Sequence, residues 1–496
     1  MKKLATITLA LLFTSIFLAG CSPEATFQKA EELEKSGKVE EAIKLYHRAA
    51  EQGFAPAQVK MGDIYYEGVL RTKDFPEVVR WFTLAAEQNN PVAQRKLGYC
   101  YYNGVGVEEN PIKAADLWLK SAKQGDRLAQ RIIGLSYELG KGLPKDPREA
   151  VKWYNEAAAN GDITAKFLLG ECYQDGKIVE KDSSKAVKLF HEAAKEGHPE
   201  AQRNLGFAYA FGDGIKKNQT EAVKWIKKAA EQGDSLAESY LGHYYHRGNG
   251  VEQNDIEAVK WFSKAAEQGE PLAQYQLGNC YLFGVGVQQS ETRAVKWLTK
   301  AAEQGNADTM SLLGGLYIKY QNPVEISIKE TFGIETRNIN PYDNLKNYNI
   351  KENIPEGKMW LEKAAKLGNT DAMFKLYFIY RKERQLEKEE KWLIKAAKLN
   401  NTDAMIELGI TYIAGRNNPN SLIKRDFNEG IGWIDSAAKQ GNTNAMLLLG
   451  MCYAVGEYLP GNTIKMDLNK AKMWLKKADE LGNENAKKVL DKLPNS

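Results

Sequence analysis

The side chains that could act as nucleophiles, general bases or metal ligands are few and scattered in this chain. It has five histidines and five cysteines among 496 residues. Only His243 and His246 are spaced to share a helix face, and no cysteine or carboxylate at a fixed offset completes a metal site. Ser421 and Lys424 match the Ser-x-x-Lys pattern of acyl-transfer enzymes, but its usual Ser-Asp-Asn and Lys-Thr-Gly companions are absent. We therefore predict no catalytic residue, no metal site and no cofactor.

Four of the five cysteines occupy one recurring position. Cys100, Cys172, Cys280 and Cys452 each follow Leu-Gly by one residue and precede a tyrosine. Two adjacent repeats never both carry a cysteine there, and a disulfide needs Cα atoms within about 7 Å of each other. We expect four free, buried thiols.

The cysteine position belongs to a repeat that runs through most of the chain. The segment Trp-Ile-Lys-Lys-Ala-Ala-Glu-Gln-Gly, residues 225–233, has near copies that end every 36 residues from residue 53 to residue 305. A second series ends at residues 368, 400, 441 and 482. Nine of the ten tryptophans lie eight residues before such an end, and Trp118 misses this position by one. A fixed period of this size predicts stacked helical hairpins.

One repeat illustrates the expected hairpin. We predict a first helix over residues 235–246 and a second over residues 255–268, because apolar residues recur there at helical spacing. Gly242 in mid-helix costs up to about 1 kcal/mol against alanine, so we expect it to contact the partner helix closely. Trp261 is expected to point into the core. Gly269 is expected to end the second helix in the left-handed conformation.

The pattern Ala-x-x-x-Leu-Gly-x-x-Tyr followed by Ala-x-x-Trp-x-x-x-Ala-Ala-x-x-Gly resembles the Sel-one-like repeat family, a relative of the tetratricopeptide repeat, over residues 54–482. The resemblance implies an all-α superhelical solenoid of about twelve hairpins, whose first helices line a concave groove that binds a protein or peptide. Some cysteine-rich relatives are described as penicillin-binding or β-lactamase proteins, but the cysteine pair that staples their repeats is absent here. A cell-wall or β-lactam-directed enzyme and a host-facing virulence adaptor are the alternatives to an interaction scaffold.

Some first-helix positions differ from repeat to repeat while the frame stays constant. They lie two residues before the recurring leucine, and two and five residues after it. Because arginine and aromatic side chains are typical interface anchors, we predict that these positions face a partner. The predicted groove residues are Arg95, Tyr99, Tyr102, Arg131, Arg203, Phe207, His243, His246 and Tyr275. The alternative is that several of these aromatic rings pack between neighbouring repeats.

The first residues have the features of a targeting segment. Two lysines precede an apolar run over residues 4–18, which is too short to span a bilayer comfortably. The segment then closes with Leu-Ala-Gly-Cys over residues 18–21, whose last residue is Cys21. This resembles a bacterial lipoprotein signal peptide of residues 1–20, which implies that Cys21 becomes the acylated first residue. Ser22 resembles an outer-membrane sorting signal. We expect a lipid-anchored protein of the bacterial cell envelope. The alternative is an ordinary secretory signal cut nearby.

Charge and spacing complete the expected organisation. The 68 basic and 64 acidic residues give a net charge of +4, which argues against a nucleic-acid partner. We expect a monomer with a tether over residues 21–26, an N-terminal repeat block over 27–320 and a C-terminal block with a closing helix over 356–496. Between them, residues 321–355 form an insertion without helical periodicity. A loop of this length is usually functional or disordered.

Overall fold

The computed structural model describes residues 22–69, 73–322, 324, 327–328, 345–416, 418–455 and 465–493. Its regular elements in these ranges are helices, which form twelve antiparallel pairs and a short closing helix. This confirms the predicted all-α solenoid of stacked hairpins. The chain divides into unit 1, residues 1–237 and 249–251, and unit 2, residues 238–248 and 252–496. The predicted signal peptide and Cys21 lie outside the described residues.

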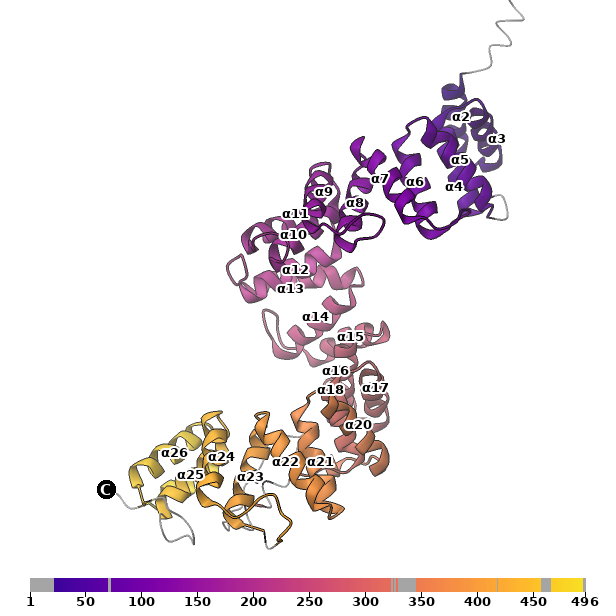
Figure 1. Ribbon diagram of the computed structural model, residues 1–496. Coiled ribbons are helices and arrows are strands. Elements are labelled where there is room, and N and C mark those ends of the chain that lie inside the picture. The colour runs from indigo at the N-terminus through magenta and orange to yellow at the C-terminus, as the bar shows by residue number, and fades with distance from the viewer. Residues whose placement is uncertain are drawn as a thin grey trace, which may run out of the picture. The chain divides into compact units, whose positions relative to one another are not determined.

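Unit 1 holds six hairpins, each of which packs on the next along the chain (Figure 1). Its helices are α2 (Pro23–Lys35), α3 (Val39–Glu51), α4 (Ala55–Glu67), α5 (Phe75–Glu87), α6 (Pro91–Asn103), α7 (Pro111–Lys123), α8 (Arg127–Leu139), α9 (Pro147–Ala159), α10 (Ile163–Asp175), α11 (Ser183–Lys195), α12 (Pro199–Phe211) and α13 (Gln219–Glu231).

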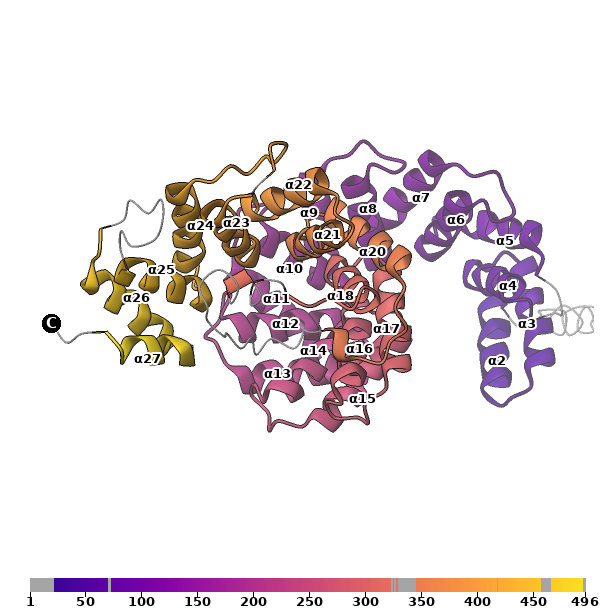
Figure 2. The ribbon, with the colours of Figure 1, turned by 90° about the horizontal axis from the view of Figure 1, so that it is seen from below.

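Unit 2 begins within α14 and ends with the closing helix α27, which packs against α26 (Figure 2). Its helices are α14 (Ser235–Arg247), α15 (Asp255–Glu267), α16 (Pro271–Phe283), α17 (Glu291–Glu303), α18 (Ala307–Tyr317), the 3₁₀ helix η2 (Leu345–Asn347), α20 (Ile354–Lys366), α21 (Thr370–Lys382), α22 (Leu386–Lys398), α23 (Thr402–Ala414), α24 (Phe427–Lys439), α25 (Thr443–Val455), α26 (Leu468–Glu480) and α27 (Glu484–Leu490).

Local sequence signals place the ends of these helices. The side chain of Asn254 caps α15 by accepting a hydrogen bond from the backbone N–H of Glu257 at 3.0 Å. Gly269, with φ +95°, follows the end of that helix in the left-handed conformation, as predicted. Asn89 and Asn400 take the same conformation at φ 60° and 68°. The predicted bounds of α14 and α15 agree with the structure to within one residue.

Where a first helix has the recurring glycine, this glycine faces the residue that follows the tryptophan position in the second helix. A Cβ atom built on Gly242 would lie 2.6 Å from the ring of Phe262, and one on Gly98 would lie 2.5 Å from Nε1 of Trp118. This confirms the expected close contact between the paired helices. It also explains Trp118, which fills the glycine-facing position instead of the tryptophan position.

The recurring tryptophans are only partly the core residues that we expected. Five of them are buried: Trp81, Trp225, Trp261, Trp360 and Trp474. Four are half-buried: Trp153, Trp297, Trp392 and Trp433. A basic side chain one turn later often covers the ring, as Nζ of Lys264 does at 4.2 Å from the ring centroid of Trp261. The ring therefore lies at the edge of the core, and the following residue lies at its centre.

A polar ladder joins successive hairpins within each unit. Nε2 of the buried Gln202 donates to the carbonyl oxygen of Ala194 in the preceding hairpin at 3.0 Å, and its Oε1 accepts at 2.7 Å from Gln232, which ends the second helix of its own hairpin. Equivalent bonds join Gln58–Gln88, Gln94–Gln124, Gln130–Asn160, Glu238–Gln268 and Gln274–Gln304, and an ion pair joins Lys166–Glu196. Because each bond satisfies a buried polar group, the ladder favours one register between neighbouring repeats.

The described ends of the insertion belong to the core of unit 2. Tyr320, Ile328 and Leu345 are buried among the helices around them. Residues 329–344 lie outside the described residues. The predicted division into repeat blocks on either side of residues 321–355 stays a prediction.

Candidate functional site

Three first helices of unit 1, α6, α8 and α12, carry aromatic or aliphatic side chains on one exposed side. Residues two and six positions after the recurring leucine are four apart and share one side of a helix. This side carries Tyr99 in α6, Leu135 and Leu139 in α8, and Phe207 and Phe211 in α12. Tyr99, Leu139 and Phe211 are 48%, 64% and 75% exposed. We call these five residues the first-helix face of unit 1.

The three predicted groove arginines each bind an aspartate of the following hairpin. The pairs are Arg95–Asp126, with Nε 3.1 Å from both carboxylate oxygens, Arg131–Asp162 at 3.1 Å, and Arg203–Asp234 at 2.9 Å. Each aspartate also caps a first helix, as Asp234 does by accepting from the N–H of Ala237 at 2.8 Å. The guanidinium groups therefore help to hold neighbouring repeats together. Whether they also contact a guest stays a prediction.

The residue at the arginine position varies together with the cap 31 residues later. Where Phe167 replaces arginine, the cap is His198, and the two rings stack at 4.8 Å between centroids. Nδ1 of His198 still accepts a hydrogen bond from the N–H of Ala201 at 3.3 Å. The constant spacing is visible in the sequence. Comparing each variable position with the next helix cap would have revealed this pairing.

The predicted tyrosines of α6 take part in aromatic contacts between repeats. The ring of Tyr99 meets that of Tyr66 in α4 edge-on at 6.4 Å between centroids. Tyr102 lies 5.3 Å from Trp118, and Nζ of Lys141 lies 5.6 Å above its ring. Tyr102 and Lys141 also line a hollow of about 410 Å³. The predicted alternative, packing of aromatic rings between repeats, therefore describes Tyr102 well, whereas nearly half of Tyr99 stays exposed.

The remaining predicted groove residues have different surroundings. The ring of Phe207 lies 6.5 Å from that of Phe211 on the first-helix face. In unit 2, the half-buried His243 lies edge-on to Phe262 at 5.2 Å, and Nδ1 of His246 lies 2.7 Å from Oδ1 of Asp255. Tyr275 packs against the core of unit 2.

The comparisons with known proteins agree with this architecture. The Sel1 repeat model matches residues 36–54, 55–90, 91–126, 127–162, 163–198, 199–234, 235–270, 271–306, 345–369, 390–401, 402–442 and 443–483. The chain belongs to the Sel1 repeat family. This fold is typical of protein–protein interaction scaffolds, and Sel1 repeat proteins are generally not enzymes.

Two solved Sel1 repeat structures resemble the chain over much of its length. A protective antigen of uropathogenic Escherichia coli strains, which displays an SLR fold, is 28% identical with a TM-score of 0.71, and the match covers 92% of this chain and 91% of that one. A Sel1 repeat protein from Oxalobacter formigenes is 32% identical with a TM-score of 0.47, over 66% of this chain and 87% of that one. The comparison with curated proteins returns no match.

The residues of the Sel1 repeats that could do chemistry lie where they serve the packing of the fold. Cys100, Cys172, Cys280 and Cys452 are free and buried, as predicted. Burial raises the pKa of the Cys100 thiol to about 11 and that of Cys280 to about 12, so both remain protonated and weakly nucleophilic at neutral pH. Among the described residues, no group of three or more His, Cys, Asp or Glu side chains is arranged to hold a metal ion.

The Ser-x-x-Lys match does not bring its two side chains together. Oγ of Ser421 donates to Oε1 of Glu390 at 2.5 Å, whereas Nζ of Lys424 donates to the carbonyl oxygen of Pro419 at 2.8 Å. The serine is thus held by a carboxylate and the lysine by the backbone. This arrangement supports the interpretation that the match arose by chance.

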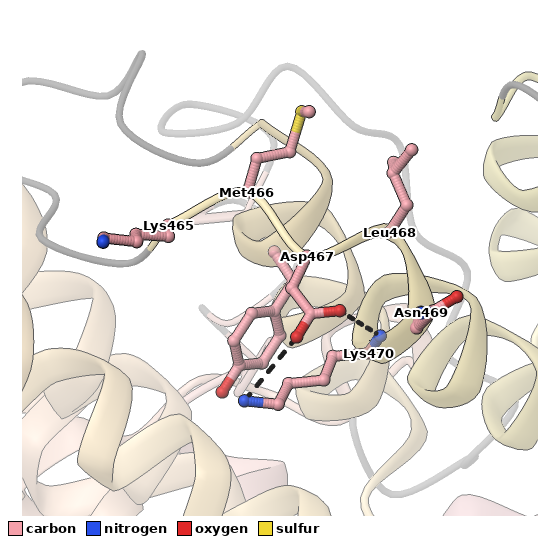
Figure 3. A pocket seen from close by; sticks show the side chains of 7 residues that line it. Lys465, Met466, Asp467, Leu468, Asn469 and Lys470 are labelled. Carbon is pink, nitrogen blue, oxygen red and sulfur yellow. Dashed lines mark hydrogen bonds and ion pairs between the residues drawn. The ribbon is translucent and has the colours of Figure 1, made fainter. Parts of the chain in front are cut away.

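Figure 3 shows a hollow of about 680 Å³ at the start of α26. Asp467 caps this helix by accepting from the N–H of Lys470 at 2.9 Å, and its carboxylate also lies 3.7 Å from Nζ of the same lysine. That Nζ lies 5.2 Å from the ring centroid of Tyr453. The polar groups here serve a helix cap and one another, so we assign no chemistry to the hollow.

We expect acid to destabilise unit 2 through His243. Burial lowers the pKa of His243 to about 4, with smaller contributions from Arg247 and His246. The folded state favours the neutral ring. His243 therefore makes its full contribution to the free energy of unfolding above a pH of about 6.5, the pKa of histidine in the unfolded chain. That contribution is lost as the pH falls from about 6.5 towards 4 and amounts to roughly 1–3 kcal/mol.

Urea unfolding of the wild type and of His243→Gln, at pH 7.5 and at pH 4.5, measures this loss. The wild type should lose more stability than the variant between the two pH values. Equal losses would show that His243 does not titrate with a lowered pKa.

Proposed function

We propose that this Sel1 repeat protein is a lipid-anchored scaffold of the bacterial cell envelope, and that it binds a segment of a partner protein on the first-helix face of unit 1. The observation that carries the proposal is the exposure of Tyr99, Leu139 and Phe211 on that face. Large apolar side chains that recur on one surface are typical of interaction sites, and rings of this size are frequent binding hot spots.

The contacts that hold the repeats together support a preformed binding site. Helix caps, recurring glycines and the polar ladder hold each first helix against its neighbours before any partner arrives. A rigid surface loses little conformational entropy on binding, so more of the contact free energy appears as affinity. The apolar side chains of α8 and α12 fit a partner segment with apolar anchors that are spaced along the repeats.

Lipid anchoring rests on the sequence of the first residues. Ser22 is the N-cap of α2, whose first residue is Pro23. The first hairpin would therefore start within about 7 Å of an acylated Cys21, at roughly 3.5 Å of chain per residue. Among the described residues, no helix is long and apolar enough to cross a bilayer. The similar E. coli protein is a protective antigen, which is in keeping with an exported location for this chain.

We expect polar substitutions on the first-helix face to weaken partner binding without loss of stability. The double variant Leu139→Ser/Phe211→Ser should weaken binding by about 30-fold, the effect of losing a hot spot of 2 kcal/mol. Photo-crosslinking from position 207 in intact cells, followed by mass spectrometry, identifies the partner and allows the affinity to be measured with purified proteins.

A matched control is available on the second helices. Ile112 and Ile256 are 74% and 63% exposed, close to the values for Phe211 and Leu139. The variant Ile112→Ser/Ile256→Ser removes similar apolar area and should bind normally. The proposal fails if the two double variants bind equally well, or if the loss of binding follows a loss of folded protein.

We expect Cys21→Ser to move the protein from the membrane fraction to the soluble fraction. Acyl chains stabilise membrane binding by about 0.8 kcal/mol per buried CH₂ group, and more than one chain anchors a protein stably. Fractionation and incorporation of labelled palmitate would both report the change. If the variant stays in the membrane fraction, the anchor lies elsewhere.

A further inference from the structure

The hairpin of α21 and α22 departs from the repeat frame at three buried positions. The residue three before the tryptophan position is valine in one second helix and alanine or glycine in ten others, but it is Glu389 in α22. The next residue, Glu390, is fully buried, as is Tyr377, which takes the place of the recurring glycine in α21. Two carboxylates and a phenol thus replace small or apolar groups at the centre of one hairpin.

A buried network of charged groups surrounds these residues. Oε1 of Glu407 in α23 accepts from the hydroxyl of Tyr377 at 2.6 Å, from Nη1 of Arg381 at 2.7 Å and from Oγ of Ser327 at 2.9 Å. Nη2 of Arg416 donates to Glu389 at 2.7 Å.

Arg416 also reaches the second carboxylate of α22. Its Nε lies 3.6 Å from Oε1 of Glu390, which also accepts from Oγ of Ser421. Three carboxylates and two guanidinium groups therefore meet within unit 2.

The stack of hairpins does not require this network. Most other repeats pack with alanine, valine, isoleucine or glycine at the same positions, and buried ion pairs are seldom more stable than apolar side chains of similar volume. A set of buried charges that departs from the local frame is expected at functional sites. We therefore expect a binding site beside this network.

The network borders a cavity of about 490 Å³. Its two cations are the accessible charges, because the side chain of Arg381 is 41% exposed and that of Arg416 is 21% exposed. The carboxylates of Glu389 and Glu407 lie behind them, at 6% and 3%. Each guanidinium has five N–H groups, and the hydrogen bonds to described residues use only some of them.

Two further features of the cavity constrain its ligand. Leu386, Ile410 and Ala414 give it an apolar wall. Oε2 of Glu407 is buried and has no hydrogen-bond partner among the described residues, and a buried acceptor of this kind favours a ligand with an N–H donor. Two arginines against three glutamates leave a net charge of −1, which repels a dianion such as phosphate more strongly than a singly charged carboxylate.

We propose that this cavity binds a carboxylate whose neighbouring carbon carries an N–H group and an apolar side chain. The carboxylate lies on Arg381 and Arg416, the N–H donates to Glu407, and the side chain packs against Leu386 and Ile410. This chemistry occurs at the C-terminus of a peptide and in a free amino acid. The site lies in unit 2 and is independent of the first-helix face of unit 1.

Calorimetric titration of the full chain with N-acetyl-leucine, leucine, 4-methylpentanoate and inorganic phosphate tests the proposal. N-acetyl-leucine should bind about tenfold more tightly than 4-methylpentanoate, which lacks the nitrogen, and phosphate should bind more weakly than both. Leucine separates the two sources: binding stronger than that of N-acetyl-leucine points to a free amino acid, and weaker binding points to a peptide C-terminus.

Three variants show whether the named residues carry the binding. Arg381→Lys keeps the charge but loses the planar fork, and should weaken binding of N-acetyl-leucine about tenfold. Arg384→Lys, at an exposed arginine three residues away, should have no effect. In Glu407→Gln the preference for N-acetyl-leucine over 4-methylpentanoate should disappear.

Three results would overturn the proposal. The first is that no carboxylate gives a heat of binding at about 10 mM. The second is that phosphate binds more tightly than the carboxylates. The third is that the wild type and Arg381→Lys bind N-acetyl-leucine equally well. The comparison of ligands on the wild type needs no variant, and Arg381 is exposed enough for its lysine variant to fold.

Discussion

Replacing Trp118 with alanine is expected to lower the free energy of unfolding of unit 1 by about 3–5 kcal/mol, the range for removing a large buried aromatic side chain. Trp118 is only 4% exposed and fills the position that faces Gly98 across the hairpin. Its Nε1 donates to the carbonyl oxygen of Arg95 at 3.0 Å, and this bond is lost as well. Because close-packed interiors relax only partially around a truncated side chain, most of the cavity should remain.

Trp153→Ala is the matched comparison. Trp153 occupies the recurring tryptophan position of α9 and is only half-buried, while the following residue, Tyr154, faces Gly134. We expect this variant to lose less than half as much stability as Trp118→Ala. Hydrogen exchange of α6 to α9 resolves the loss locally, which is useful because repeat arrays need not unfold in one step. A larger loss for Trp153→Ala would mean that the recurring tryptophan is the centre of the core after all.

Replacing Arg203 with phenylalanine is expected to destabilise the junction between α12 and the following cap by about 3–5 kcal/mol, because it leaves a buried carboxylate without its cation. The side chain of Asp234 is 7% exposed and lies 2.9 Å from Nη1 of Arg203. Asp234 must stay ordered to cap the next helix, so it cannot simply turn towards water.

The chain itself supplies the compensating variant. Phe167 and His198 occupy the same two positions one repeat earlier and stack on each other. The double variant Arg203→Phe/Asp234→His should therefore recover much of the stability that Arg203→Phe loses. Chemical denaturation of the two single variants and the double variant measures the coupling as a double-mutant cycle. Additive effects would show that the pair does not interact across the repeats.

Much of the fold could be predicted from local pattern. The 36-residue period, the turn glycines and the helix caps are short-range signals, and they predicted the hairpins, the left-handed ends and the buried, free cysteines. The depth of a side chain was harder to predict. A tryptophan that recurs eight residues before each helix end suggests a core residue, whereas the contact with the partner glycine belongs to the next position.

The candidate site could be predicted only in part. Variation within a constant frame drew attention to the first helices, and Tyr99 and Phe207 lie on their exposed face. The same criterion selected Arg95, Arg131 and Arg203, whose partners lie in the next hairpin. It does not reach Leu139 and Phe211, which lie six residues after the leucine, one beyond the predicted positions.

The hairpin, its length and the stacking of about twelve copies were predictable from the amino-acid order, because these depend on interactions within about forty residues of chain. Which variable side chains are occupied by the neighbouring repeat, and which stay open to a partner, became clear only in three dimensions, because a side chain is satisfied by whatever lies next to it in space. For Arg203 that is a helix cap of the next hairpin, and for the charges around Glu407 it is a group of side chains from α21, α22 and α23, together with Ser327 and the loop that carries Arg416.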